Sequence, residues 1–144
     1  MKNSDNLEHF VLAQGHSYEQ AFQEISAGRK SSHWMWYIFP QIAGLGQSEM
    51  SRKYSIQDMQ EAQDYINHPI LGSRLIRISE ELLALHGRSA YAIFGTPDDM
   101  KLKSSMTLFS LVENAPPVFQ QVIEKYFDGQ LDERTLKLTG KTHR

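Results

Sequence analysis

The side chains that could bind or transform a small molecule fall into four groups along the sequence. In order, they are Arg29, Lys30 and His33; then Tyr54; then His68 and Arg74; then Asp98, Lys101, Ser104, Ser105 and Thr107. Arginine and lysine hold anionic groups, and a histidine beside a carboxylate is a candidate pair for general acid and base catalysis. These residue types predict acid/base chemistry on an anionic molecule, provided that the fold brings the groups together.

The composition excludes several other kinds of chemistry. The chain has no cysteine, which excludes a disulfide, a thiolate nucleophile, a cysteine-ligated zinc ion and an iron–sulfur cluster. Its six histidines are scattered, and no two have the i, i+3 or i, i+4 spacing of a helical metal site. There is no Gly-x-Ser-x-Gly elbow and no Walker motif, and Gly44-Leu45-Gly46 is too short for a dinucleotide fingerprint. We expect no metal and no cofactor.

The segment that holds both tryptophans is unusually rich in apolar side chains. Residues 33–39 have no polar face, so a helix there would be fully buried, and Pro40 would end it. One interpretation is that these aromatic side chains fill the centre of the core. The other is that they also line a pocket, because buried indole N–H groups beside His33 and Gln41 require a polar network. Both interpretations stay open.

The charged and imidazole side chains also have structural alternatives. His33 could donate a ring N–H to a backbone carbonyl, and His68 could cap the helix that follows it. The basic pair at 29–30 could complement a helix C-terminus, and Asp98 could stabilise a helix N-terminus. A pair between Asp98 and Lys101, three residues apart, would be a weak surface contact.

Helix signals begin at the N-terminus. Apolar spacing and a cap at Ser4 or Asp5 predict a helix that ends at Gly15. Ser17 would cap a second helix, with Gly28 as its stop.

Two further helices are predicted in the middle of the chain. Ser55 would cap a helix that reaches Ile66. Pro69 would be the first residue of a long helix, with an apolar stripe over residues 70–85 and a stop at Gly87.

The C-terminal part also has clear signals for helix starts. Thr96 would cap a helix with Pro97 as its first residue, and Pro117 would open the next helix. Asp132 would cap a last short helix, and the basic tail, residues 137–144, is expected to be frayed.

Together these signals predict an all-α fold, a single compact domain over residues 1–144. At typical helix lengths it would be an irregular array of about seven to nine short helices. Only residues 91–94 could form a strand, and a helical turn fits that stretch equally well. One strand cannot form a sheet, so the fold class does not depend on that choice.

Length and charge limit the class of protein further. A chain of 144 residues is the size of one domain, and a net charge of −2 does not indicate a nucleic-acid or membrane partner. No apolar run approaches the roughly 20 residues of a membrane-spanning helix. The N-terminus has no signal-peptide core. We expect a soluble cytoplasmic protein.

Several motifs together resemble one bacterial family. They are Gly28-Arg29-Lys30; His33-Trp34-Met35-Trp36-Tyr37-Ile38-Phe39-Pro40-Gln41; Gly44-Leu45-Gly46 with Ser48; Tyr65 with His68-Pro69, Leu71-Gly72 and Arg74-Leu75; Ile93-Phe94-Gly95 with Asp98 and Lys101-Leu102; and Ser104-Ser105-Met106-Thr107-Leu108-Phe109. This set resembles the signature of the family named domain of unknown function 1810. The resemblance covers nearly the whole chain and implies a small all-α protein of helical-array type, with no particular activity.

Members of this family are sometimes labelled calpastatin-like. Calpastatin is a disordered inhibitor, whereas this chain has the density of large apolar residues that is typical of a packed domain. We therefore give that label no weight.

Two functions are compatible with these observations. In the first, an aromatic and basic pocket binds a small anionic molecule, nucleotide-like or sugar-phosphate-like. His33 and Asp98 would then be the acid/base pair of a metal-independent group transfer or hydrolysis. The expected ligand-binding residues are Arg29, Lys30, Trp34, Trp36, Gln41, Tyr54, His68, Arg74, Lys101, Ser104, Ser105 and Thr107. In the second, the chain is a non-catalytic helical adaptor that contacts a protein through a helix face.

Overall fold

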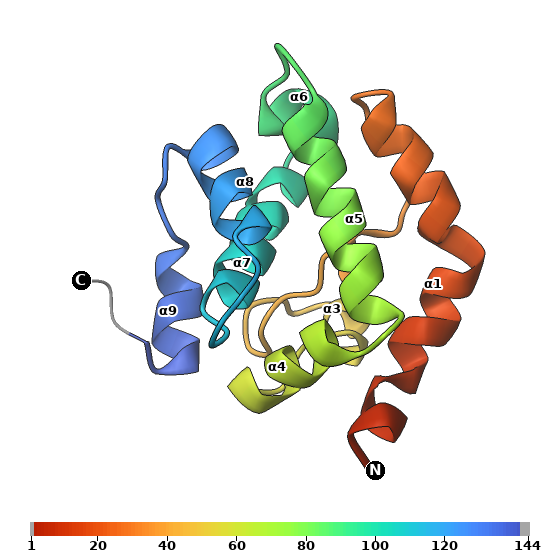
Figure 1. Cartoon of the computed structure of the whole chain (residues 1–144), viewed down its shortest axis with the longest axis vertical. Helices are drawn as coiled ribbons and strands as arrows, with labels where there is room; N and C mark the ends of the chain where they lie inside the picture. The colour runs from red at the N-terminus through yellow and green to blue at the C-terminus, as the bar shows by residue number, and fades with distance from the viewer. Residues whose placement is uncertain (1, 142–144) are drawn as a thin grey trace.

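Nine helices make up the described part of the chain, residues 2–141 of the computed structural model, with side chains described from Leu7 onward (Figure 1). They are α1 (Lys2–Ser26), α2 (Met35–Ile38), α3 (Glu49–Lys53), α4 (Met59–Asn67), α5 (Leu71–Ala84), α6 (Ala90–Phe94), α7 (Asp98–Ser110), α8 (Val118–Phe127) and α9 (Glu133–Thr139). These residues contain no sheet, only one isolated parallel bridge between Ile42 and Ile56. The prediction of an all-α fold is confirmed.

The longer helices form a row across the molecule. α1 packs on α5, α5 on α8, α8 on α7, and α7 on α9. Figure 1 shows this row running from α1 at one side to α9 at the other, with α4 crossing beneath α5. The segment from the end of α1 to the start of α4 contains only the short helices α2 and α3. Much of this segment is therefore loop, held in place by the helices around it.

The first helix is longer than predicted. We expected Gly15 to end one helix and Ser17 to cap another, but α1 runs through both residues. One buried stripe follows the helical period on either side of this point, formed by Leu7, Phe10, Gln14, Tyr18, Ala21 and Ile25. A glycine inside a helix costs only about 1 kcal/mol, which the burial of this stripe outweighs. The predicted cap at Ser4 or Asp5 is also wrong, because both residues lie inside α1.

Two of the predicted caps are displaced by a few residues. The cap of α4 is Asp58 and not Ser55, because the Asp58 carboxylate accepts a hydrogen bond from the Glu61 N–H at 2.9 Å. Pro97 occupies the cap position of α7 in place of Thr96, whose hydroxyl donates to Asp99. These two signals therefore located the starts of α4 and α7 within a few residues.

The predicted starts of the two C-terminal helices agree with the structure. Asp132 caps α9 by accepting from the Thr135 N–H at 3.0 Å, as expected. Pro117 precedes α8 directly, also as expected. Residues 137–139 belong to α9, and the fraying of the tail stays a prediction. Residues 142–144 lie outside the described part of the chain.

The stretch that could have been a strand or a helical turn is helical. It forms α6, which is capped by the Ser89 hydroxyl and followed by Gly95 at φ 72°. That left-handed conformation favours glycine, so α6 ends there.

The junction between α4 and α5 gives a test of the fold. A Cβ placed on Gly72 would lie 1.9 Å from the carbonyl oxygen of Ile66, whereas a Cβ on Gly15 meets nothing within 4 Å. We expect Gly72→Ala to lower the free energy of unfolding by about 2 kcal/mol or more, because the α4 backbone must shift. Gly15→Ala is the control and should raise it by about 0.5–1 kcal/mol. Urea denaturation of both variants measures this, and equal effects of the two substitutions would contradict the packing at Gly72.

Candidate functional site

A buried carboxylate near the end of α1 holds the segment that carries both tryptophans. Glu24 Oε1 accepts hydrogen bonds from the backbone N–H groups of Ser31 (2.8 Å) and Ser32 (3.0 Å) and from the indole N–H of Trp34 (2.9 Å). The Ser32 hydroxyl donates to the other carboxylate oxygen at 2.6 Å. The chain turns back at Gly28, where φ is 78°. Glu24 therefore fixes the course of the chain after α1.

These hydrogen bonds also control the charge of Glu24. Burial alone would raise its pKa, but the donors on Ser32, Ser31 and Trp34 outweigh that effect and lower the pKa to about 2. The side chain is therefore ionised at neutral pH. The partner of the buried indole is this carboxylate, and not the network with His33 and Gln41 that we expected.

The segment that looked like a fully buried helix is only partly helical and partly buried. Only Met35–Ile38 are helical, as α2. Trp34 is 1% exposed and lies in the core, whereas Trp36 is only half-buried. The core interpretation therefore holds for Trp34, which is buried. The pocket interpretation holds for Trp36, which lines a cavity.

Two lysines share one carboxylate beside these rings. Lys30 Nζ lies 2.9 Å from one oxygen of Asp98, and Lys101 Nζ lies 3.7 Å from the other. The Lys30 ammonium is 5.0 Å from the Trp34 ring centroid, and the Lys101 ammonium is 5.6 Å from that of Trp36. Lys30 is therefore the main partner of Asp98, and Lys101 is held only loosely.

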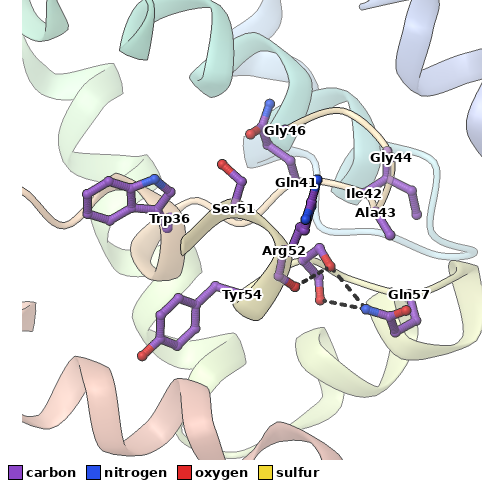
Figure 2. Close-up of a pocket in the computed structure, with 11 residues that line it drawn as sticks. Trp36, Gln41, Ile42, Ala43, Gly44, Gly46, Ser51, Arg52, Tyr54 and Gln57 are labelled. Carbon is purple, nitrogen blue, oxygen red and sulfur yellow. Dashed lines mark hydrogen bonds between the residues drawn. The ribbon is translucent and has the colours of Figure 1, made fainter. Parts of the chain in front are cut away.

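A cavity of about 220 Å³ lies between α2, α3 and the loop that joins them (Figure 2). We call it the inner cavity. Its lining residues are Trp36, Gln41, Ile42, Ala43, Gly44, Gly46, Ser51, Arg52, Tyr54, Ser55 and Gln57. They supply aromatic rings, amides, hydroxyls and one guanidinium group, and none of them is acidic.

Backbone contacts shape the walls of the inner cavity. Ala43 N–H donates to the Ile56 carbonyl, and Ile56 N–H donates to the Gln41 carbonyl, both at 2.8 Å. Gly46 packs directly on α3, because a Cβ there would lie 2.3 Å from the Cβ of Ser51. The loop is therefore pinned to α3 at one point and to the stretch before α4 at another.

Arg52 supplies the only cation among the residues that line the inner cavity. Figure 2 shows its side chain extending from α3 toward the loop that holds Gly44 and Gly46. Its guanidinium group has no acidic partner among the residues whose side chains the structure describes. Arg52 is exposed, so its unpaired guanidinium is accessible, and together with a lining without carboxylates it favours an anionic guest.

A second, more open hollow of about 280 Å³ adjoins the first, and we call it the outer groove. It shares Gln41 and Gly46 with the inner cavity. Its other lining residues come from the loop, the start of α7 and the start of α9: Leu45, Pro97, Met100, Lys101, Ser104, Asp132 and Arg134. The two hollows are therefore neighbours across the Gln41 side chain.

The two hollows bring together five of the predicted ligand-binding residues. Trp36, Gln41 and Tyr54 line the inner cavity, and Gln41, Lys101 and Ser104 line the outer groove. They come from α2, α7 and the loops around α3, which are far apart in the sequence.

Three of the predicted residues lie near the end of α1 instead. Arg29 and Lys30 line a separate, open hollow beside that helix, where Arg29 is exposed. Trp34 is buried in the core and bonded to Glu24. None of the three lines the inner cavity or the outer groove.

His68 and Arg74 also lie outside both hollows. His68 Nδ1 accepts from the backbone N–H groups of Ile70 (3.1 Å) and Leu71 (3.3 Å), so it acts as a cap for α5. The guanidinium carbon of Arg74 lies 5.4 Å from the ring centroid of Tyr18. Both side chains are thus engaged in contacts that join helices.

Ser105 and Thr107 lie on α7 and are buried in the interior of the protein. Ser105 is fully buried, and its hydroxyl has no hydrogen-bond partner among the described residues. Thr107 is also fully buried, and its Oγ1 accepts from the Asp132 N–H at 3.0 Å. Thr107 therefore ties α7 to the start of α9.

The predicted acid/base pair is not joined in the structure. His33 is exposed and lines neither hollow. No ion pair or hydrogen bond connects it with Asp98 in the described part of the chain, and Asp98 is bound by Lys30 and Lys101. The catalytic role of the pair stays a prediction.

Sequence reasoning missed two cationic residues of the site, Arg52 and Arg134. Ser48 followed by Glu49 is a cap signal that could have indicated the short helix α3, and with it Arg52 two residues before Tyr54. No local signal indicates that Arg134 on α9 lies beside the Gln41 loop.

The described residues contain no group of three or more histidine, aspartate or glutamate side chains that could hold a metal ion. Nor does any described helix have the length and apolar character needed to cross a membrane.

The fold and the two hollows define a small all-α protein of helical-array type, with two adjoining hollows between α2, α3, α7 and α9. The chain belongs to the family described as "Protein of unknown function (DUF1810)", whose model matches residues 4–139. A solved structure, that of the conserved hypothetical protein Rv1873 from Mycobacterium tuberculosis, is 44% identical over 95% of this chain and 98% of that one, with a TM-score of 0.92. A search of curated proteins found no match. The family resemblance is confirmed, and neither description names an activity.

The Glu24 network predicts a specific loss of stability. Glu24→Gln keeps the side-chain size but replaces one acceptor oxygen with an NH₂ group that faces other donors. We expect a loss of about 2–4 kcal/mol in the free energy of unfolding, measured with urea. The control is Glu19→Gln on the same helix, which removes an exposed pair with Arg77 and should cost less than about 1 kcal/mol. Equal losses for the two variants would contradict the role of Glu24.

The same carboxylate predicts a pH dependence. Its pKa falls from the ordinary 4.5 to about 2 on folding, so the ionised side chain stabilises the fold above about pH 4.5. This contribution is lost as the pH falls from about 4.5 toward 2. Melting temperatures over that range should therefore fall more steeply for the native protein than for Glu24→Gln. Parallel curves would show that Glu24 does not titrate in this way.

Proposed function

We propose that the protein binds a small anionic molecule, nucleotide-like or sugar-phosphate-like, in the inner cavity. The observation that carries this proposal is the Arg52 guanidinium, which lines the cavity without an acidic partner in the described residues. A guanidinium fork matches the oxygens of a phosphate or carboxylate. The absence of carboxylates from the lining adds to this preference.

The remaining walls suit a ring that carries polar groups. Trp36 provides half-buried aromatic surface. The Tyr54 ring is buried against Phe10 and Tyr37, at centroid distances of 5.8 and 5.2 Å, and points away from Arg52 in Figure 2, so it supports this wall from behind. The Gln41 amide makes no side-chain hydrogen bond that involves the described residues, so its donors and acceptor are available to a guest. Aromatic walls with a few such polar groups are typical of small-molecule sites.

A chemical reaction is a separate part of the proposal, because neither His33 nor Asp98 lines either hollow. It would be a metal-independent group transfer or hydrolysis, with His33 and Asp98 as acid and base. We expect His33→Ala to leave binding unchanged, because this exposed side chain lines neither hollow. Turnover of any molecule that binds would then be compared in the native protein and in His33→Ala. Loss of turnover with intact binding would support the pair, and unchanged turnover would exclude His33.

The alternative function is a non-catalytic adaptor. The exposed large apolar side chains of the described residues belong to five different parts of the chain: Leu12, Ile70, Tyr91, Met100 and Leu138. Two of them adjoin the site, since Met100 lines the outer groove and the Leu138 side chain lies beside Gly44, 3.2 Å from where a Cβ would be. The small-molecule proposal therefore has the more specific support. A cytoplasmic location and the lack of a nucleic-acid partner stay predictions.

A thermal-shift panel of nucleosides, nucleotides and sugar phosphates tests the binding proposal. A ligand at 100 times its dissociation constant should stabilise the native protein by about 2.7 kcal/mol. Arg52→Ala should weaken the binding of any hit by about tenfold or more, because it removes the anion partner. The control Arg29→Ala removes an exposed arginine outside the cavity and should bind as the native protein does. A panel without a hit would favour the adaptor, and a hit that does not depend on Arg52 would place the ligand elsewhere.

A further inference from the structure

We infer that the ligand is bipartite, with a ring in the inner cavity and a diphosphate-type group in the outer groove. This inference rests on the proposed function and deepens it, because it names the class of ligand as a nucleoside diphosphate or a molecule built in the same way. Three features of the structure carry it: the continuity of the two hollows, the size of each, and the placement of the cations.

The two hollows form one continuous surface. Gln41 and Gly46 line both of them. A cation–aromatic contact also crosses the boundary, because Lys101 of the groove lies over the ring of Trp36 in the cavity, 5.6 Å from its centroid. A ligand that enters one hollow can therefore extend into the other past the Gln41 side chain.

The inner cavity is too small for a whole nucleotide, so a ligand of that size must extend into the outer groove. At about 220 Å³ it is smaller than the roughly 300–1,000 Å³ of typical small-molecule pockets. It can hold a ring but not a whole nucleotide. The outer groove adds about 280 Å³. A molecule of nucleotide size therefore has to occupy both hollows.

The cations of the outer groove indicate what occupies it. Lys101 and Arg134 line it together. Arg134 has no acidic partner among the described side chains, and Lys30, at 2.9 Å, already neutralises the Asp98 carboxylate that Lys101 approaches. Arg134 is therefore available to a ligand, and Lys101 can exchange its loose contact with Asp98, at 3.7 Å, for a ligand oxygen. A diphosphate carries more than one negative charge and matches two such groups.

The acidic side chains of this region limit how far the anion extends. The Asp132 carboxylate lines the groove and is held at the start of α9, because its Oδ2 accepts hydrogen bonds from the Thr135 N–H (3.0 Å) and hydroxyl (2.7 Å), so its negative charge repels an anion on that side. A third hollow continues beyond Arg134, but Glu133 and Lys103 both line it. The opposite charges of that pair make the third hollow a poorer anion site than the groove. The negative group should therefore end between Lys101 and Arg134.

Isothermal titration calorimetry with adenosine, adenosine monophosphate, adenosine diphosphate and inorganic diphosphate tests this inference, and a uridine series tests whether the base matters. We expect the diphosphate to bind about tenfold or more tightly than the nucleoside, since each phosphate gains a charged partner. Arg134→Ala should weaken nucleoside diphosphate binding by about tenfold and leave nucleoside binding within about twofold. Lys101→Ala should act in the same direction. The control is Lys137→Ala, an exposed cation on the same helix that lines neither hollow and should change nothing.

The possible outcomes distinguish a failure of the bipartite ligand from a failure of ligand binding in the inner cavity. Equal binding of nucleoside and nucleoside diphosphate, with no effect of Arg134→Ala, would overturn the bipartite ligand but leave the inner cavity as a binding site. Inorganic diphosphate that binds as tightly as the nucleotide would overturn it too, because the ring would then contribute nothing. No binding by any of these molecules or by sugar phosphates would overturn both. Melting temperatures of the unliganded variants show whether each variant is folded. Arg134→Glu is a second variant at this exposed position, and it should weaken nucleoside diphosphate binding as Arg134→Ala does.

Discussion

The site depends on one buried interaction, the acceptance of four hydrogen bonds from residues 31–34 by the Glu24 carboxylate. This carboxylate directs the Trp34 ring into the core, and the short helix α2 then starts at once, so that Trp36 lies over the inner cavity. The same turn brings Lys30 to Asp98 at the start of α7. This ionised side chain therefore fixes the start of α2 and links it to the start of α7, which itself packs on α6, α8 and α9.

The sequence predicts most of the helices because their signals are local. Caps such as Asp132 and the apolar stripe of α5 need no knowledge of distant residues. Gly15 shows the limit of this reasoning, since its tendency to end a helix is overruled by the buried stripe of α1. The two tryptophans show another, because residues two apart on a helical turn point to nearly opposite sides, and only the fold reveals which of them is buried.

The candidate site is less predictable than the fold because it is assembled across long distances in the sequence. The aromatic and amide side chains of the inner cavity belong to a segment that the sequence marks as unusual. The outer groove instead requires α9 to pack beside the Gln41 loop, where a Cβ on Gly44 would lie 3.2 Å from the Leu138 side chain. No local pattern indicates that contact, so Arg134 could not be predicted, whereas Lys101 and Ser104 were already among the candidate side chains of the sequence.

The central claim is that small anionic ligands occupy the cavity beside Trp36. The chain has only two tryptophans, so a ¹⁵N-labelled sample gives two indole N–H resonances, which Trp36→Phe assigns. Trp34 is buried and bonded to Glu24, whereas Trp36 is half-buried and lines the cavity. On titration with a nucleoside diphosphate, the account predicts that the Trp36 resonance shifts and saturates while that of Trp34 stays nearly unchanged. A ligand that binds without moving the Trp36 resonance would contradict it.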